Sequence, residues 1–484
     1  MKNSTKWSFL TELMAKFITP ITGMILARLL TPEAFGVMAA IMVVTSFAEM
    51  FADAGFQKYF MQHEFYDEAE KRKCFGTALL TSCLAAAFIW LLIAVFSVEI
   101  ATLLGTKEVA DGIRVAGFGL VLTSFNGMQA AIFKRGFQFK LLFKLKMITL
   151  SVPLLVTIPL AYFGAGFWAL VWGMLVQQGA TCIIQGHYTS MPLSKSIDLT
   201  MLKKMLSFSL WTLLESVTIW FSTYGGMFLV GTLLSSYYLG LYRGMLTLTG
   251  AALSLISGAI VPVFFVALSR LQNDMSAFRQ MFYNVQQKTA LVILPLGVFL
   301  FVFADVFVGI MLGNQWHEGD FFFGLRALTS AVSILINSFA SEALRAKGMP
   351  RLSALSQALH FPVLWFGLWY GSKYSFDAVA LGLCASSLWL DLVKGVILRQ
   401  VLGCSLRKMM VGIVNAAIPA GGAGFFAWET RAILVDVYDL FAIVSAILVF
   451  IVCYILLIIV RKSNRQLLFG GLAYLKNKIY MSYR

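Results

Sequence analysis

The sequence has few charged residues and almost no stretch polar enough to form a soluble domain. Asp, Glu, Lys and Arg make up 13% of the 484 residues, while 59% are hydrophobic. Soluble domains carry about 25% charged residues. The motifs GxxxxGK[ST], HExxH and GxSxG are missing as well. These absences exclude a soluble fold, make ATP hydrolysis by this chain implausible and argue against an enzyme.

Cysteine and histidine are too scarce and too scattered for a metal or redox centre. None of the six cysteines forms CxxC or falls in a predicted external loop, and no two of the four histidines have ligand spacing. A disulfide framework or zinc site needs clustered ligands. We therefore predict no metal and no cofactor.

Hydrophobic stretches of membrane-spanning length dominate the chain. A bilayer core takes about 20 apolar residues as helix. Fourteen such stretches lie at 7–30, 35–57, 75–97, 111–132, 144–163, 165–186, 207–232, 238–266, 284–311, 321–342, 352–370, 375–399, 409–427 and 436–460. The first follows a basic start without a small-residue cleavage site, so we expect it to be retained as a span. The sequence predicts an all-α integral membrane protein of about 14 transmembrane helices.

Basic residues are confined to alternate loops. We place 30 of the 38 Lys and Arg in the tails and loops on one side of the membrane and five on or beside the other side. The basic side is cytoplasmic by the positive-inside rule, so both termini are expected inside. The same rule and attraction to anionic headgroups account for the net charge of +15. No basic stripe interleaved with aromatics suggests nucleic acid as a partner.

The chain contains two similar halves. Residues 27–37 (ARLLTPEAFGV) align without a gap on 231–241 (GTLLSSYYLGL), and 134–137 (KRGF) align on 346–349 (AKGM). Both matches fall at equivalent topological places, at offsets of 204 and 212. Six spans per half make a parallel repeat, which predicts two pseudo-symmetric six-helix lobes around a central cavity. The last two spans form an appendage.

These patterns predict five regions. An N-lobe with spans 1–6 covers 1–190, and a cytoplasmic linker covers 191–206. A C-lobe with spans 7–12 covers 207–400, spans 13 and 14 cover 401–462, and a cytoplasmic tail covers 463–484.

Ionisable residues inside the spans are the candidates for function, because each costs roughly 2.5–3.5 kcal/mol on insertion scales. The first two spans of each half are expected to line the central cavity. Their charged residues, the cavity candidates, are Glu12, Lys16, Glu49, Asp53, Glu215 and Arg243. Lys16 and Arg243 suit an anionic substrate, and the carboxylates suit a coupling cation. The alternative is local pairing of Glu12 with Lys16 and ordinary satisfaction of the others.

Charges nearer the span ends have simpler explanations. Asp305 and Arg326 lie near the outer ends of their spans and could pair with each other or form an outer gate. Asp391 and Lys394 lie near cytoplasmic ends, where snorkelling suffices.

The segment Ala27 to Gly36 (ARLLTPEAFG), followed by 47–56 (FAEMFADAGF), resembles the start of bacterial polysaccharide and O-antigen flippases. The resemblance is strongest to the branch containing the colanic acid exporter, whose R-G-F-x-F-K segment is similar to 135–140 (RGFQFK). The resemblance implies membership of the multidrug/oligosaccharidyl-lipid/polysaccharide exporter superfamily. Beyond residue 163 the similarity is mainly architectural.

This resemblance implies a flippase for lipopolysaccharide or capsule-type precursors in the bacterial inner membrane. The expected substrate is an undecaprenyl-pyrophosphate-linked repeat unit, moved by alternating access. Lys16 and Arg243 would then face the pyrophosphate. Coupling to H+ or Na+ and cooperation with a polysaccharide polymerase and glycosyltransferases are further expectations, and we expect a monomer.

Two other functions are weighed against this one. A cation-coupled multidrug exporter of the same superfamily would use Glu49, Asp53 and Glu215 as coupling groups. A membrane glycan polymerase or ligase would need a large external loop, which the chain lacks. Few cationic candidates lie in the spans, which also weakens a lipid II flippase.

Overall fold

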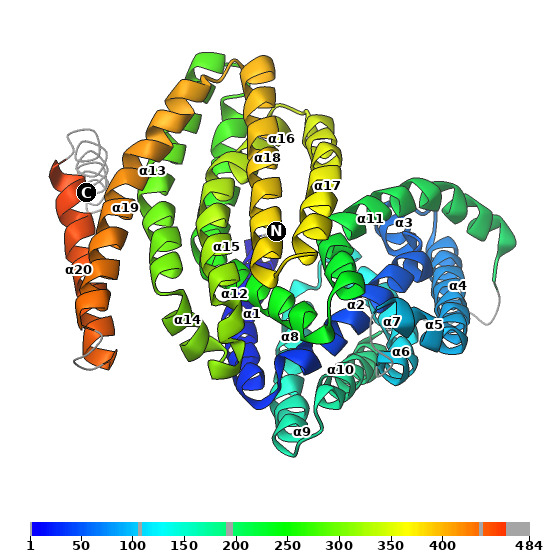
Figure 1. Cartoon of the computed structure of the whole chain (residues 1–484). Coiled ribbons are helices and arrows are strands. Elements are labelled where there is room, and N and C mark those ends of the chain that lie inside the picture. The colour runs from blue at the N-terminus through cyan, green and yellow to red at the C-terminus, as the bar shows by residue number, and fades with distance from the viewer. Residues whose placement is uncertain (1, 105–108, 190–196, 435–438, 461–484) are drawn as a thin grey trace. The chain divides into compact units, whose positions relative to one another are not determined.

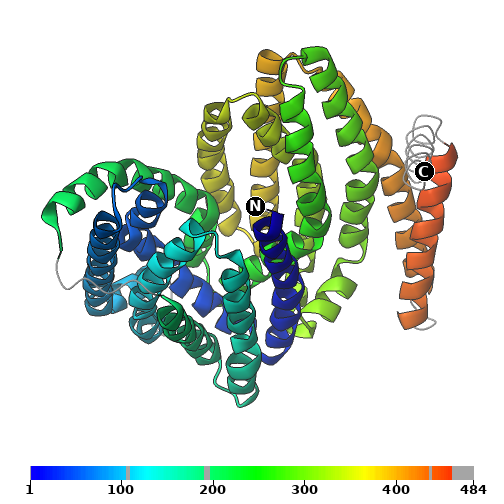
Figure 2. The same ribbon diagram turned by 180° about the vertical axis from the view of Figure 1, so that it is seen from behind.

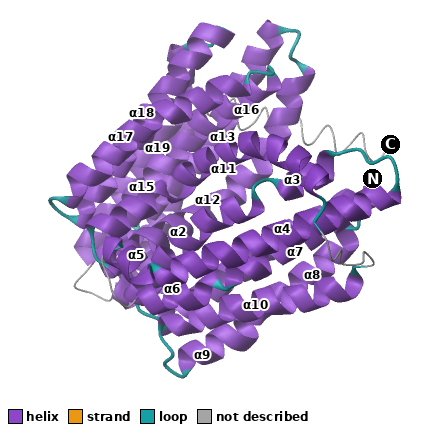
Figure 3. Ribbon diagram, turned by 90° about the vertical axis from the view of Figure 1, so that its right-hand side faces the viewer, coloured by secondary structure: helices purple, strands orange, loops and turns teal. Residues whose placement is uncertain are grey.

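The computed structural model describes residues 2–104, 109–189, 197–434 and 439–460. All regular elements of these residues are helices, as Figure 3 shows. They form two compact units. Unit 1 comprises residues 1–244 with 311–316, and unit 2 comprises 245–310 with 317–484, within the described ranges.

Unit 1 is built from the first eleven α-helices and the first residues of the twelfth, 236–244 (Figure 1). The helices are α1 Lys2–Leu29, α2 Pro32–Asp53, α3 Phe56–Gln62, α4 Glu68–Val95, α5 Ser97–Leu103, α6 Val109–Gly117, α7 Gly119–Arg135, α8 Phe139–Val152, η1 Pro153–Thr157, α9 Ile158–Tyr162, α10 Phe167–Tyr188, α11 Leu199–Leu233 and α12 Ser236–Arg270. The long α11 packs on α2, α3 and α4. Helices α2 and α7 both contact α4, α6 and α10, and α1 packs on α8.

Unit 2 contains the rest of α12 and the helices that follow it, seen from behind in Figure 2. These are α13 Met275–Val302, α14 Ala304–Met311, η2 Asn314–Gly319, α15 Asp320–Ser333, η3 Ile334–Ser338, α16 Phe339–Ala346, α17 Pro350–Ser372, α18 Phe376–Leu402, α19 Leu406–Leu434 and α20 Asp439–Val460. Helix α13 packs on α15 and α19, and α18 packs on α15 and α17.

The helices reproduce the pattern of about 14 spans. Among the described residues, ten helices are apolar and long enough to cross a membrane, counting joined helices such as α8 to α9 as one. The bent helix α12 is an eleventh. The other three predicted spans coincide with α1, α11 and α17, which have 28, 35 and 23 residues. At 1.5 Å per residue, each exceeds the roughly 30 Å hydrocarbon core.

The repeat is visible in helix boundaries and caps. Helices α2 and α12 begin at Pro32 and Ser236, an offset of 204. The N-caps of α4 and α13 are Asp67 and Asp274, an offset of 207, and each carboxylate accepts from backbone N–H groups of the first turn. Insertions therefore shift the offset along the chain while the elements stay in the same order.

The second sequence match needs a shift of one residue. The αL positions that end α7 and α16 are Phe137 (φ 53°) and Gly348 (φ 70°). The bonds Gln138 N–H to Phe133 O (2.9 Å) and Met349 N–H to Leu344 O (2.8 Å) close both turns. The backbone offset at this turn is thus 211, one residue less than in the predicted alignment, which matched Gly136 with Gly348.

Two glycines let the repeats touch backbone to backbone at the start of α2 and α12. A Cβ on Gly36 would lie 1.7 Å from the Ser236 carbonyl oxygen, and one on Gly240 would lie 1.8 Å from that of Pro32. Gly36 and Gly240 are 204 residues apart, and so are Pro32 and Ser236. Each glycine therefore meets the equivalent carbonyl of the other helix. Only glycine permits so close an approach.

Side chains of Gln315 and Trp316, distant in sequence, hydrogen-bond to the end of α1 beside this contact. The Gln315 Nε2 amide donates to the Ala27 and Leu30 carbonyls at 2.7 Å, and the Trp316 Nε1–H donates to Ala27 O at 2.9 Å. These side chains satisfy carbonyls that the helix end leaves without partners. Trp316 is fully buried, with its ring edge on Phe35.

The crossing predicts that Gly240→Ala destabilises the protein. The added methyl group overlaps the Pro32 carbonyl, and overpacking of this kind costs about 1–3 kcal/mol. Thermal unfolding of the purified protein in detergent should show a lower midpoint. The matched control is Gly250→Ala on the same helix, where a Cβ meets nothing within 4 Å. Equal midpoints for the two variants would contradict the crossing.

Candidate functional site

A small polar cavity inside unit 1 contains Glu49. The cavity measures about 160 Å³ and is lined from α2, α6, α7, α10 and α11. Its polar lining groups are Thr45, Ser46, Glu49, Thr123, Gln178 and Tyr224. Their hydroxyl, amide and carboxylate groups can bind a hydroxylated or cationic ligand.

The cavity walls are held by hydrogen bonds that leave Glu49 available. The Thr123 hydroxyl donates to Gln178 Oε1 at 2.7 Å, and the Asn126 amide donates to the Gln178 carbonyl at 3.0 Å. Within the described residues, no hydrogen bond or ion pair engages the Glu49 carboxylate. Glu49 is therefore the predicted residue whose surroundings best fit a binding role.

A second, larger cavity in unit 1 is purely apolar. It measures about 700 Å³ and lies among α2, α4, α5 and α11. Trp220 of α11 lines this cavity, while its Nε1–H donates to the Ser46 hydroxyl at 3.0 Å. Ser46 lines the polar cavity. One indole ring thus separates two spaces of opposite chemistry.

Arg243, near the start of α12, is a cation inside unit 1. Its Nη1 is buried and has no hydrogen-bond partner among the described residues. Tyr224, which lines the polar cavity, interacts electrostatically with it. A buried guanidinium without an acceptor suits an anionic ligand, since such a group is costly when unpaired.

The remaining cavity candidates divide into two groups. The side chains of Glu12, Lys16 and Glu215 lie outside the described residues, so their roles stay predictions. Asp53 ends α2, and backbone N–H groups of Gly55 and Gln57 bond to it, which indicates a role in the turn to α3. Its Oδ1 is buried without a partner in the described part of the chain.

The predicted Asp305–Arg326 pair does not form. Arg431 of α19 binds Asp305 with both guanidinium nitrogens, at 2.8 Å for Nη1 to Oδ1. Arg326 Nη1 instead donates to the Ser387 hydroxyl at 2.7 Å. Sequence depth placed the two residues at similar levels, but they point to different neighbours. A gate role for either one stays a prediction.

Arg326 lines a polar cavity within unit 2. This cavity measures about 200 Å³ and lies between α12 and the α15–η3 helix. Hydroxyl groups of Thr249, Ser254, Ser257 and Ser330 share it with the guanidinium. The site is cationic, in contrast to the Glu49 cavity, and could hold a phosphate or sugar hydroxyls.

Asp391 and Lys394 of α18 are buried, so the expected snorkelling of these side chains to the membrane surface does not occur. Their exposed fractions are 4% and 1%. The Ser333 hydroxyl donates to Asp391 Oδ2 at 2.8 Å, and the Lys394 ammonium donates to Ser353 at 3.2 Å and also to Ser341. The sequence signal for this buried pair is the spacing of two opposite charges at i and i+3 within an apolar span.

Unpartnered acceptors gather around this pair. In the described residues, Asp391 Oδ1 and Asn337 Oδ1 are buried without hydrogen bonds. Asn337 belongs to the π-helix η3, which directly follows Ser333. Single π-turns inside α-helices are frequent at functional sites. The unpartnered carboxylate oxygen of Asp391 can accept a proton or a small cation.

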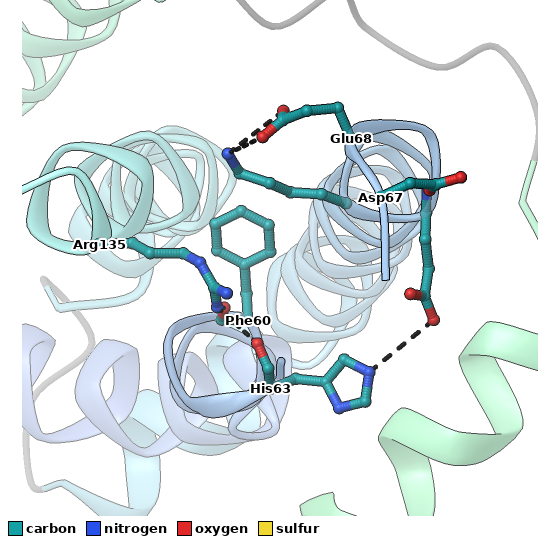
Figure 4. Close-up of polar contacts among 7 residues, drawn as sticks. Phe60, His63, Asp67, Glu68 and Arg135 are labelled. Carbon is teal, nitrogen blue, oxygen red and sulfur yellow. Dashed lines mark hydrogen bonds and ion pairs between the residues drawn. The ribbon is translucent and has the colours of Figure 1, made fainter. Parts of the chain in front are cut away.

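A polar cluster at the basic-loop end of unit 1 explains the R-G-F-x-F-K segment (Figure 4). Arg135 Nη1 donates to the carbonyls of Phe60 and His63, at 2.6 and 2.7 Å, at the end of α3. Its guanidinium also lies 4.5 Å from the Phe65 ring centroid. Arg135 therefore holds the end of α3 against α7.

In the second repeat a basic side chain also donates to a backbone carbonyl and lies near an aromatic ring. The Lys347 ammonium donates to the Gln272 carbonyl at 2.6 Å and lies 6.0 Å from the centre of the Phe278 ring. Arg135 and Lys347 thus hold carbonyls that are themselves 212 residues apart. A cation–aromatic contact accompanies the hydrogen bond in both halves.

The comparisons with known proteins agree with this architecture. The sequence profile of a family described as "Polysaccharide biosynthesis protein" matches residues 25–319, more than half of the chain. The chain belongs to this family.

Curated relatives extend the match over most of the chain. An uncharacterized membrane protein in the cps region of Klebsiella pneumoniae is 24% identical over 376 residues, 76% of each chain. The succinoglycan biosynthesis transport protein ExoT of Rhizobium meliloti (strain 1021) is 23% identical over 81% of this chain and 77% of its own. The lipopolysaccharide biosynthesis protein WzxC of Escherichia coli (strain K12) is 20% identical over 65% and 64%.

Solved structures show the same fold at low identity. The inward closed conformation of the lipid II flippase MurJ matches with a TM-score of 0.74, at 15% identity, over 97% of this chain and all of that one. An inward-facing multidrug resistance MATE family transporter matches with a TM-score of 0.58, at 12% identity, over 81% and 98%. The fold class predicted from sequence is confirmed.

Arg135→Ala should destabilise unit 1. The substitution leaves the carbonyls at the end of α3 without their donor, which costs about 1–3 kcal/mol. The control is Lys134→Ala, which removes a neighbouring exposed positive charge from the same basic loop. We expect a lower unfolding midpoint and less protein in the membrane for Arg135→Ala only. Equal losses would instead assign the effect to loop charge.

Proposed function

We propose that this protein is a flippase for an undecaprenyl-pyrophosphate-linked oligosaccharide repeat unit. It would work by alternating access, without covalent chemistry, in the bacterial inner membrane with both termini cytoplasmic. Membership of the polysaccharide biosynthesis family carries the proposal. Relatives named for succinoglycan transport and lipopolysaccharide biosynthesis support it. Cooperation with a polymerase and glycosyltransferases, and action as a monomer, are parts of the same proposal.

The chemistry inside the units supports a substrate that is polar at one end. The unit 1 cavity presents hydroxyl, amide and aromatic groups beside Glu49, as binding of a sugar requires. Arg243 in unit 1 and, separately, Arg326 in unit 2 each present a guanidinium group that can bind phosphate. Guanidinium binds phosphate oxygens in two-pronged geometry, which fixes orientation as well as adding binding energy.

A cation-coupled multidrug exporter is the second candidate. Glu49 favours it specifically, because an available carboxylate in a polar cavity can bind a cationic drug or titrate during transport. The MATE likeness shows the fold alone. Drug susceptibility of a deletion strain separates the two functions.

We further propose that transport is coupled to H+ or Na+ through Asp391. Its unpartnered Oδ1 and that of Asn337 are the acceptor atoms that support this choice. Arg326 and Lys394 are the charged groups that act on Asp391, and Lys394 is held by serines rather than by an ion pair with Asp391. Asp391 can therefore gain and lose a cation without first breaking a salt bridge.

Arg243→Gln is expected to reduce flipping about tenfold or more, because a charged hydrogen bond to phosphate is lost. The assay complements a host lacking its own flippase and measures repeat units retained on the cytoplasmic leaflet together with surface polysaccharide. Arg399→Gln is the control, since Arg399 is exposed at the far end of α18. Normal glycan export in the complete deletion, with altered sensitivity to cationic drugs, would favour the multidrug exporter.

Asp391→Asn is expected to uncouple transport from the ion gradient. In proteoliposomes, wild-type flipping should accelerate when a Na+ or pH gradient is imposed, whereas the variant should proceed at one rate with or without it. Asp377→Asn, on the exposed first turn of the same helix, is the control. A variant that keeps the full response to the gradient would rule out Asp391 as the coupling group.

A further inference from the structure

The apolar cavity of unit 1 is too large and too uniform to be a packing defect. It measures about 700 Å³, and each of its fourteen lining side chains is a hydrocarbon or aromatic group. Voids in protein interiors are rarely larger than a water molecule. Ligand cavities in contrast measure about 300–1,000 Å³. A space of this size and chemistry suits an apolar ligand.

The cavity is open at the surface of unit 1. Phe47 and Phe51 of α2, Leu92 of α4 and Leu103 of α5 line it and are all exposed. These four side chains come from three helices, so they outline an opening rather than a single ridge. An occupant can enter sideways without unfolding the unit.

The neighbouring polar cavity defines what kind of molecule fits. Trp220 lines the apolar side with its ring, which contacts Phe47 at 4.9 Å between centroids. Its N–H points to Ser46 on the polar side, and Tyr224 stacks on it at 6.2 Å. A ligand that occupies both spaces must be a long apolar chain joined to a polar head. A phospholipid tail would need only the first.

We propose that the cavity among α2, α4, α5 and α11 binds the polyprenyl chain of the lipid-linked saccharide. This inference rests on the proposed function. Trp220 would lie at the junction, with Ser46 and Tyr224 beside it. Arg243, which interacts with Tyr224, would bind the pyrophosphate next to the chain, and Glu49 would accept hydrogen bonds from sugar hydroxyls beyond it. The chain stays in hydrocarbon surroundings while the head is held in the polar cavity.

Photo-crosslinking tests the occupant directly. The full-length protein carries p-benzoylphenylalanine at Leu92 or, as a matched control, at Leu84. Both are exposed leucines of α4, but only Leu92 lines the cavity. Membranes receive labelled undecaprenyl phosphate or labelled phosphatidylglycerol before irradiation. We expect about tenfold more undecaprenyl label at position 92 than at 84, and similar phosphatidylglycerol label at both.

Equal undecaprenyl labelling at the two positions, or preferential labelling of position 92 by phosphatidylglycerol, would overturn the proposal. The second result would make the cavity a phospholipid site.

A substitution gives an independent readout. Leu92→Trp fills part of the cavity, whereas Leu84→Trp adds the same bulk outside it. Saccharide lipids with a C55 and a C15 chain should differ in affinity for wild type and for Leu84→Trp. We expect Leu92→Trp to lose about tenfold of that chain-length preference, because each buried methylene contributes to binding. An unchanged preference would contradict the assignment.

The outcomes separate the two proposals. If wild type flips the saccharide lipid but Leu92→Trp keeps both flipping and chain preference, the chain site is wrong and the flippase stands. If wild type fails to restore glycan export while position 92 still captures undecaprenyl phosphate, the proposed function is wrong and the lipid site stands.

Discussion

The backbone contact between α2 and α12 is the constraint on which the arrangement of unit 1 depends. Gly36 and Gly240 each leave room for a carbonyl of the other helix, and a single methyl group at either position would overlap it. The contact places the first turns of α2 and α12, the second spans of the two halves, against each other. Gln315 and Trp316 then bind the neighbouring end of α1 from a segment almost 290 residues away. Small residues allow such close helix contacts where hydrophobic burial cannot drive association.

The two units satisfy polar groups in the membrane interior in different ways. Unit 1 keeps a carboxylate and a guanidinium, Glu49 and Arg243, without strong partners in the described residues. Unit 2 surrounds Arg326, Asp391 and Lys394 with serine hydroxyls instead of pairing them. Hydroxyl partners stabilise a charge less than an opposite charge does. Both arrangements therefore leave charged groups that an ionic ligand can still engage, as transport requires.

Residues that identify a family need not touch its substrate. Arg135 belongs to the most recognisable loop of this chain, yet its guanidinium is used to hold the end of α3. In the second repeat Lys347 holds the Gln272 carbonyl in the same way. The basic residues are 212 apart, whereas the turns that end α7 and α16 are 211 apart. Trp220 carries no sequence signal beyond being aromatic, and it divides the two cavities that matter most for the proposed substrate.

Sequence alone determined the span pattern, the repeat and the membrane setting, because a helix satisfies its own backbone and its hydropathy is read locally. It also set the depth of each charge, so Glu49 and Arg326 were recognised as intramembrane groups. Tertiary structure decided the partners: Asp305 binds Arg431 rather than Arg326, and Asp391 and Lys394 are buried rather than snorkelling. Depth follows from counting 1.5 Å per residue, but the direction a side chain faces turns by 100° per residue. Which neighbour it meets depends on how helices distant in sequence pack.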